Sequence, residues 1–186
     1  MSVRDLLALD ARLSLRLRRA ERPGPLRTLS ILFAHSGDSW FWAIALLSVW
    51  FLGGASAKQW AVVQFVGISS LAALVLVIKF SVRRQRPQGD WGEIYRSTDP
   101  HSFPSGHAAR AFLIAVLASG LGSGGLAPVL WVWAPLVALA RVAMGVHYLS
   151  DILAGAILGI VCGLIGLEIY PAIFSWLSSW LGFAFW

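Results

Sequence analysis

The feature that most constrains this chain is a series of apolar stretches, each nearly as long as a bilayer is thick. A transmembrane helix needs about 20 mainly apolar residues, and five stretches approach that length. The chain is 58% hydrophobic and only 13% charged, whereas soluble domains carry about 25% charged residues. We therefore predict an all-α, polytopic transmembrane bundle of about five spans. The spans are Ser39 to Ala57, Trp60 to Ile78, Gly106 to Leu121, Leu126 to Gly145 and Leu149 to Tyr170.

The two ends of the chain differ from this central region. Residues 4–22 place leucines at helical spacing beside several arginines, which predicts an amphipathic helix. Such a helix lies on an anionic membrane surface or packs against the protein, and both interpretations stay open. Residues 26–34 are apolar but too short to cross a bilayer. We predict a single domain over 1–186, with an interfacial segment at 1–38, a helical core at 39–170 and an aromatic tail at 171–186.

The last predicted span has two features of its own. Gly155, Gly159 and Gly163 recur every four residues, and small residues at this spacing let two helices approach closely. We expect them to pack within the bundle, with a contact between two copies as the alternative, so the oligomeric state stays open. Pro171 is expected to end or kink the helix. Beyond it lie Phe174, Trp176, Trp180 and Trp186, as expected of a segment at the membrane interface.

Charged and polar residues gather in three clusters near the ends of the spans. Such residues are costly at membrane depth and therefore indicate function. Counting the spans brings all three clusters to the same face of the membrane. The clusters are Lys79 with Arg86, Pro104 to His107, and Arg141 with His147 and Asp151.

Five of these residues suit a phosphate group. Lys79, Arg86 and Arg141 supply three cations that can surround one small anion, and the clusters contain a single acid to neutralise them. Ser105 and Gly106 begin a helix, where free amide groups and the helix dipole favour an anion. We therefore expect these five residues to bind phosphate.

The remaining three residues supply reactive groups. His147 and Asp151 are four residues apart, and a carboxylate so placed orients an imidazole whose other nitrogen attacks phosphorus. His107 then protonates the leaving alkoxide. The nine acidic residues show no paired arrangement, so we expect neither a metal nor another cofactor.

Three motifs, in this order, resemble the signature of the type 2 phosphatidic acid phosphatase (PAP2) superfamily. They are Lys-x6-Arg-Pro at 79–87, Pro-Ser-Gly-His at 104–107 and Arg-x5-His-x3-Asp at 141–151. The resemblance implies a magnesium-independent lipid phosphatase with a phosphohistidine intermediate on His147, Asp151 orienting it and His107 as the acid. It implies phosphate binding by the five residues named above.

Two details refine this resemblance. The third motif of the family usually begins Ser-Arg, but Ala140 precedes Arg141 here, so a missing hydroxyl is expected to tune the phosphate pocket. Residues 101–110 resemble the branch of presqualene diphosphate and polyprenyl-type phosphatases. That similarity favours an isoprenoid phosphate or diphosphate, with a phosphatidic acid-type lipid as the alternative. Arg110 either contacts a second phosphate, pairs with Asp99 or has a structural role.

Other classes of protein share parts of this pattern. Vanadate-dependent haloperoxidases carry a similar constellation because vanadate mimics phosphate, but they are soluble and much longer. A non-enzymatic lipid-binding or transport bundle would have lost the reactive groups, and here both histidines and the aspartate are present. The net charge is +6, which could suggest binding to nucleic acid. However, nucleic-acid bases have no access to charges placed between membrane spans, so we expect no nucleic-acid partner. We expect the partners to be the bilayer and a lipid substrate.

The distribution of basic residues predicts which way the site faces. Basic residues in short loops tend to stay cytoplasmic. Only Lys58 lies at the end opposite the motifs, so we predict a multi-pass protein of the inner cell membrane with a cytoplasmic active site. A further span over 26–40 would invert this orientation. The basic residues at the motif end are Arg4, Arg12, Arg16, Arg18, Arg19, Arg22, Arg27, Arg83, Arg84 and Arg96.

Overall fold

The computed structural model of this chain describes residues 2–89, 91, 99–122 and 125–181. Arg96 and Trp186, used in the predictions above, lie outside these ranges. The described part is helical, as predicted, and contains one isolated bridge, between Gln85 and His101. The helices are α1 (Val3–Leu17), α2 (Pro25–Ser36), α3 (Ser39–Leu52), α4 (Ala55–Val82), α6 (Gly106–Gly120), α7 (Leu126–Ala143) and α8 (Leu149–Leu181).

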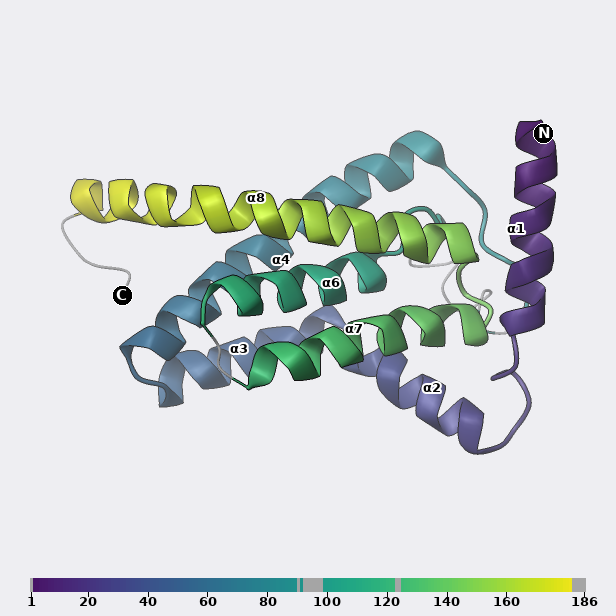
Figure 1. The fold of residues 1–186 in the computed structure, drawn as a ribbon, viewed down its shortest axis with the longest axis horizontal. Helices are drawn as coiled ribbons and strands as arrows, with labels where there is room; N and C mark the ends of the chain where they lie inside the picture. The colour runs from purple at the N-terminus through teal and green to yellow at the C-terminus, as the bar shows by residue number, and fades with distance from the viewer. Residues whose placement is uncertain (1, 90, 92–98, 123–124, 182–186) are drawn as a thin grey trace.

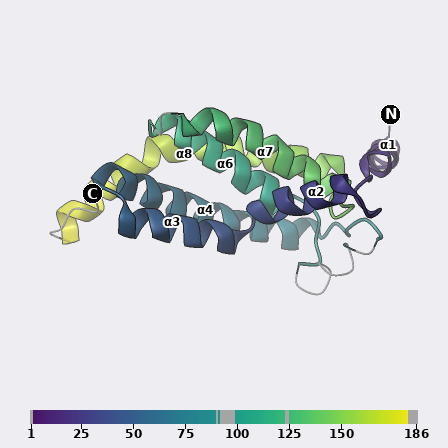
Figure 2. The ribbon, with the colours of Figure 1, turned by 90° about the horizontal axis from the view of Figure 1, so that it is seen from below.

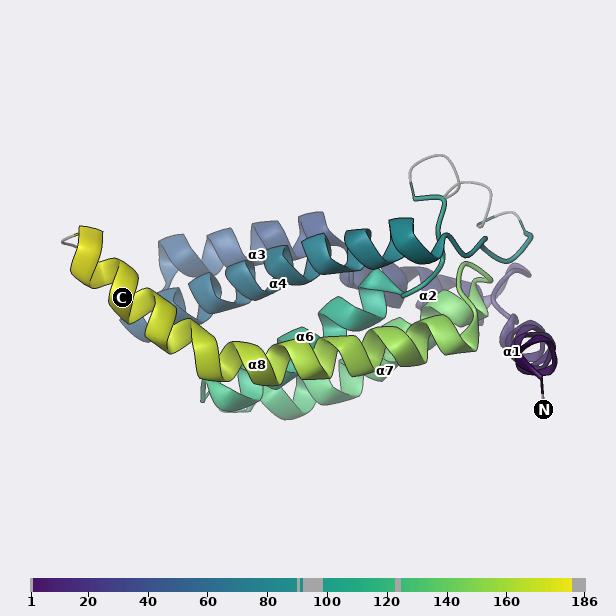
Figure 3. The ribbon, with the colours of Figure 1, turned by 90° about the horizontal axis from the view of Figure 1, so that it is seen from above.

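The helices form two layers along one long axis. α6, α7 and α8 lie side by side in one layer, and α3 and α4 form the other (Figure 2). α2 and α3 follow one another along the bundle, with a break between them (Figure 3). α1 lies across the end of the bundle where α7 ends and α8 begins (Figure 1).

The lengths of some spans differ from those expected. Among the described residues, three helical stretches are long and apolar enough to cross a membrane: Ala55–Val82, Leu126–Ala143 and Leu149–Trp176. α3 and α6 are apolar but shorter. α3 ends early because the chain turns at Gly53 and Gly54, and α4 then begins at Ala55. α6 (Gly106–Gly120) matches the predicted span to within one residue.

The C-terminal aromatic residues divide between the core and the surface. α8 continues through Pro171, and its C-terminal part bends (Figure 3). Phe174 is buried in a cluster with Val63 and Leu117, so the prediction that it lies at the interface is wrong. Trp176 and Trp180 are exposed and stack on one another. The bend of α8 explains the difference, because it carries one face of the tail back onto the bundle.

Three glycines on α8 allow it to lie directly against α6. A Cβ atom on Gly155 would lie 2.5 Å from the Ser105 carbonyl oxygen, and one on Gly159 would lie 2.1 Å from that of Ala109. Gly163 meets the side chain of Val116 in the same way. The prediction that these glycines pack within the bundle is confirmed.

α1 packs on the bundle through its polar side. Asp10 and Ser14 face α8, and Ser14 is buried. The leucine stripe points elsewhere and stays exposed; it consists of Leu6, Leu9, Leu13 and Leu17. The helix therefore contacts the protein, as one interpretation of the sequence held, and still leaves its apolar face for a membrane surface, as the other held.

Candidate active site

The predicted site residues come together where α4 ends, α6 begins and the chain turns from α7 into α8. This is the convergence expected from counting spans. Burying charged groups is costly unless they are paired, so their partners decide what the site can do. The buried members are Lys79, Arg86, Ser105, Arg141, His147 and Asp151.

A cavity of about 290 Å³ opens beside these residues. Lys79, Gly106, His107 and His147 line one end of it. A Cβ atom on Gly106 would meet only Val75, at 3.6 Å, so the space next to the first amide groups of α6 is open to a ligand. The other end is apolar and follows α4 through Ile68, Leu71, Ala72, Val75 and Leu76.

Arg86 determines which nitrogen of His147 is available for attack. Its Nη1 lies 3.2 Å from His147 Nε2 and also donates to the Val146 carbonyl oxygen at 2.9 Å. A guanidinium has no acceptor atom, so Nε2 must be the acceptor and the proton must reside on Nδ1. Nδ1 faces Asp151 Oδ2 at 3.4 Å, which is too long for a good hydrogen bond. This arrangement directs the Nε2 lone pair away from Asp151 and toward Arg86, which must release it before Nε2 can act as a nucleophile.

The charge around His147 keeps its imidazole neutral. Burial lowers the pKa of His147 well below its usual value, and the nearby charges of Arg86, Arg141 and Lys79 lower it further. A neutral imidazole is the form that attacks phosphorus. Arg141 lies in the last turn of α7, and its carbonyl oxygen accepts from the Val146 amide at 3.1 Å, so the turn that leads to His147 begins at this residue.

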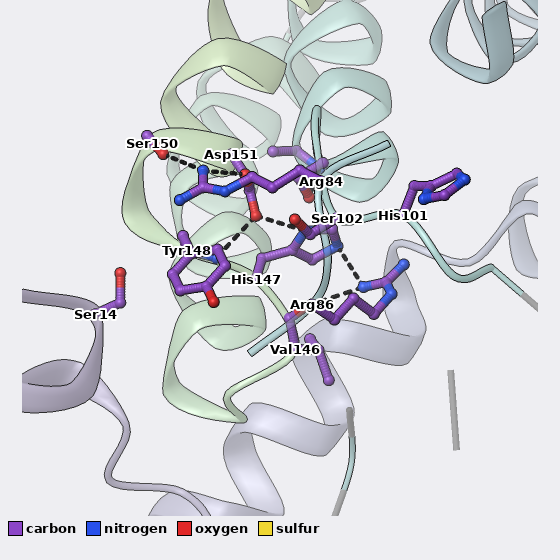
Figure 4. A network of polar contacts seen from close by, with 12 residues as sticks. Ser14, Arg84, Arg86, His101, Ser102, Val146, His147, Tyr148, Ser150 and Asp151 are labelled. Atoms are coloured by element: carbon purple, nitrogen blue, oxygen red, sulfur yellow. Dashed lines mark hydrogen bonds and ion pairs between the residues drawn. The ribbon is translucent and has the colours of Figure 1, made fainter. Parts of the chain in front are cut away.

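Asp151 is held by groups that the sequence motifs do not include. Its Oδ1 accepts from Arg84 Nη1 at 2.7 Å, and its Oδ2 accepts from the Tyr148 amide at 2.9 Å. Arg84 lies over the Tyr148 ring, with 4.0 Å between the guanidinium carbon and the ring centroid (Figure 4). On sequence alone, Arg84 counts only as one of the basic residues that predict membrane orientation. The structure shows that it also holds Asp151. His147 precedes α8, so a turn and not a shared helix face brings it to Asp151.

His107 has a carboxylate partner that sequence reasoning missed. Its Nε2 lies 2.7 Å from Asp38 Oδ1, and His35 Nδ1 lies 2.8 Å from the other oxygen. Burial alone would raise the pKa of Asp38, but the hydrogen bonds from His107 and His35 outweigh it and hold that pKa below its usual range. The available signal was the polar break at 35–38, which interrupts an apolar segment.

Asp99 neutralises two of the predicted phosphate-binding cations. It forms an ion pair with Lys79, and its Oδ2 lies 2.7 Å from Arg86 Nη2. The expectation that Asp151 is the single acid near these cations is therefore wrong. Asp99 lies in the connection between α4 and α6, where neither helical spacing nor a motif pointed to it. The Asp99 carboxylate therefore occupies the hydrogen-bond donors of Lys79 and Arg86, which a bound phosphate would use.

Two further expectations are corrected. Arg110 does not pair with Asp99 but donates to the Gly37 carbonyl oxygen, and it lines the cavity beside His107. Ala140 packs among buried apolar residues that include Ala20 and Ala34. Ala140 is not among the residues that line the cavity beside Lys79, His107 and His147.

Within the part of the chain that the structure describes, no three His, Cys, Asp or Glu residues are grouped to hold a metal ion. The donors around the cavity are mainly cationic, which suits an anionic ligand.

The chain matches known proteins over most of its length. A sequence profile described as the PAP2 superfamily matches residues 60–175. A decaprenylphosphoryl-5-phosphoribose phosphatase of Mycobacterium tuberculosis is 35% identical over 150 residues, covering 78% of this chain and 80% of the relative. A probable lipid phosphate phosphatase beta of Arabidopsis thaliana is 29% identical over 192 residues, covering 88% and 89%.

A solved structure shares the fold. The PAP2 type phosphatidylglycerolphosphate phosphatase from Bacillus subtilis, a transmembrane protein, superimposes with a TM-score of 0.73. The match covers 91% of this chain and 88% of that one, at 22% identity. Together with the long apolar helices, this likeness identifies an integral membrane protein. With its three motifs meeting at one cavity, the chain belongs to the PAP2 superfamily.

Proposed function

We propose that this protein is a metal-independent phosphatase that removes a phosphoryl group from a membrane lipid through a phosphohistidine on His147. The main support for this proposal is the composition of the cavity at the site. One end presents Lys79, His107 and His147, and the other is an apolar wall formed by α4. A molecule with a phosphorylated head and a hydrocarbon chain matches both ends.

In the first step, His147 Nε2 attacks phosphorus and the bond to the lipid oxygen breaks. His107 donates its proton to that oxygen. A lipid monophosphate therefore leaves as the neutral alcohol, and a lipid diphosphate leaves as the lipid monophosphate. Asp38 holds His107 toward the leaving group. Asp151 stabilises the positive charge that develops on the imidazole of His147, through the Nδ1 proton that faces it.

In the second step, a water molecule attacks the phosphorus of the phosphohistidine. His107, now neutral, takes a proton from that water, and the phosphorus–nitrogen bond breaks to release inorganic phosphate. Throughout, Lys79, Arg86 and Arg141 stabilise negative charge on the phosphoryl oxygens. Ser105 and Gly106 contribute the N-terminus of α6. For the substrate phosphate to bind Lys79 and Arg86, the ion pairs that these residues form with Asp99 must break.

We further propose that the substrate is an isoprenoid lipid with a second anionic group, such as a diphosphate. Arg110 lies three residues beyond His107 on α6 and lines the cavity on the leaving-group side. Its Nε is buried and has no hydrogen-bond partner. The mycobacterial relative is named for a decaprenyl-linked phosphoribose, a lipid of this chemical kind. A second phosphoryl group would satisfy Arg110.

We also propose that the protein lies in the inner cell membrane with the site facing the cytoplasm. α1 lies at the end of the bundle that holds the site (Figure 1). Its arginines are exposed. Lys58 lies at the start of α4, at the other end. The positive-inside rule favours the arginine-rich end in the cytoplasm.

The histidine mechanism is tested by phosphate release from farnesyl diphosphate and phosphatidic acid in detergent with EDTA. Wild type should release phosphate, and His147→Ala should lose at least about a thousandfold in kcat. His107→Ala should lose the lipid reactions. With p-nitrophenyl phosphate, whose leaving group needs no proton, it should still release an initial burst of about one p-nitrophenol per enzyme, followed by slow turnover because the second step also uses His107. A fully active His147→Ala would exclude the nucleophile, and a wild type silent on both lipids would exclude the function.

Removing the Asp99 carboxylate should strengthen anion binding. Asp99→Asn should lower the inhibition constant for orthovanadate by about threefold to tenfold, because Lys79 and Arg86 lose a competing charge-assisted partner. Asp5→Asn, a change of the same kind on an exposed carboxylate, should leave the constant at its wild-type value. Weaker inhibition of Asp99→Asn would mean that Asp99 positions the cations instead of competing for them.

The head-group proposal predicts a change in selectivity at Arg110. The ratio of kcat/KM for farnesyl diphosphate to that for farnesyl monophosphate should fall about tenfold or more in Arg110→Gln, since one charge-assisted contact is lost. Arg110→Lys, which keeps the charge but not the fork of donors, should give an intermediate ratio. An equal loss on both substrates would assign Arg110 a structural role.

Orientation is tested with single cysteines in a Cys162→Ala background. Arg12→Cys should react with an impermeant maleimide in inverted vesicles but not in intact cells. Lys58→Cys should react in intact cells. The reverse pattern would place the site on the outer face.

A further inference from the structure

The first turn of α8 is capped from the other end of the chain. The opening amide groups of a helix have no partner within it, and the residue just before the helix usually supplies one. Here the Leu149 amide donates to Ser14 Oγ at 2.8 Å, and the Ser150 amide donates to Asp10 Oδ1 at 3.0 Å. Both acceptors belong to α1, at least 135 residues earlier in the sequence.

Arg84 links α1 to Asp151, the carboxylate that faces His147. Arg84 Nη2 lies 2.7 Å from Asp10 Oδ2, and its Nη1 lies 2.7 Å from Asp151 Oδ1. Nη1 also donates to Ser150 Oγ at 2.6 Å, and that hydroxyl donates to Asp10 at 2.5 Å. Figure 4 shows Arg84 between Ser150 and Asp151, with its side chain across Tyr148. Asp10, Arg84 and Ser150 thus form a closed ring of contacts, and Arg84 extends this network to Asp151.

This network bears directly on the orientation of His147. Asp151 is fully buried and faces His147 Nδ1 at 3.4 Å, so a small shift of the first turn of α8 changes that approach. Asp10 acts on the turn twice, through the Ser150 amide and through Arg84. Reactive groups must be held within fractions of an ångström for efficient transfer.

We propose that Asp10 is a positioning residue of the active site, which holds Arg84 and the start of α8 so that Asp151 keeps His147 oriented. The inference rests on the proposed role of His147 as nucleophile. It assigns α1 a part in the reaction beyond any contact with the membrane. A purely structural alternative is that Asp10 only attaches α1 to the bundle, in which case its loss affects stability and not turnover.

The test compares Asp10→Asn and Asp10→Ala with Asp5→Asn, using the lipid phosphate release assay. Asp5 lies on the same helix, where its side chain accepts from the Ser2 amide and does not contact α8. We expect kcat to fall about tenfold in Asp10→Asn and further in Asp10→Ala, with KM within about twofold of wild type. Asp5→Asn should match wild type. Melting temperatures in detergent are measured for each variant.

A double-mutant cycle with Arg84→Gln tests whether Asp10 acts through the arginine. Coupled residues give non-additive effects, so Asp10→Asn should cost much less in the Arg84→Gln background than in wild type. Additive losses, an unchanged kcat in Asp10→Ala, or a loss that follows a lowered melting temperature would each overturn the proposal. If His147→Ala stays active, the proposed function fails instead; if only the Asp10 variants behave as wild type, this inference fails alone.

Discussion

The close contact between α6 and α8 is the constraint on which the site depends. Gly155 and Gly159 leave no room for a Cβ atom against the α6 backbone, so the two helices lie directly on one another. In a membrane, this packing replaces the hydrophobic driving force that holds soluble helices together. It also brings the Ser105 amide to the Asp151 carbonyl oxygen at 3.0 Å. The N-terminus of α6, where we propose that phosphate binds, is therefore joined by a backbone hydrogen bond to the residue whose carboxylate faces His147.

A second constraint is the burial of several charges at one place. Lys79, Arg86, Arg141 and Asp151 are almost inaccessible to solvent, and charges in such surroundings need partners. Asp99 forms ion pairs with Lys79 and Arg86, and Arg84 forms an ion pair with Asp151. Lys79, Arg86 and Asp151 are thus held by internal ion pairs. In the proposed reaction the substrate phosphate takes the place of one of those partners, which makes binding an exchange of anions.

The motif residues and their partners differ in how far the sequence revealed them. Lys79, His107, His147 and Asp151 were predicted because reactive residue types recur at span ends in a recognisable order. Asp10, Asp38, Arg84 and Asp99 were missed as site residues. Asp38 lies at a break between two helices, and Asp99 lies in a loop. Asp10 is on a helix whose arginines and leucines were the stronger signal. No spacing rule connects any of them to the histidines they support, because the contacts form only when distant segments meet.

The sequence by itself determined the all-α membrane class, the glycine face of α8 and the order of the three motifs, since these follow from apolar length, local spacing and residue chemistry. Only the tertiary structure decided which charges pair, that α3 ends at Leu52, and that α1 caps α8. Pairing and capping depend on atoms brought within about 3 Å of one another, across 13 residues for Arg86 with Asp99 and 140 residues for Asp10 with Ser150. That proximity arises from helix packing, and it has no local pattern in the chain.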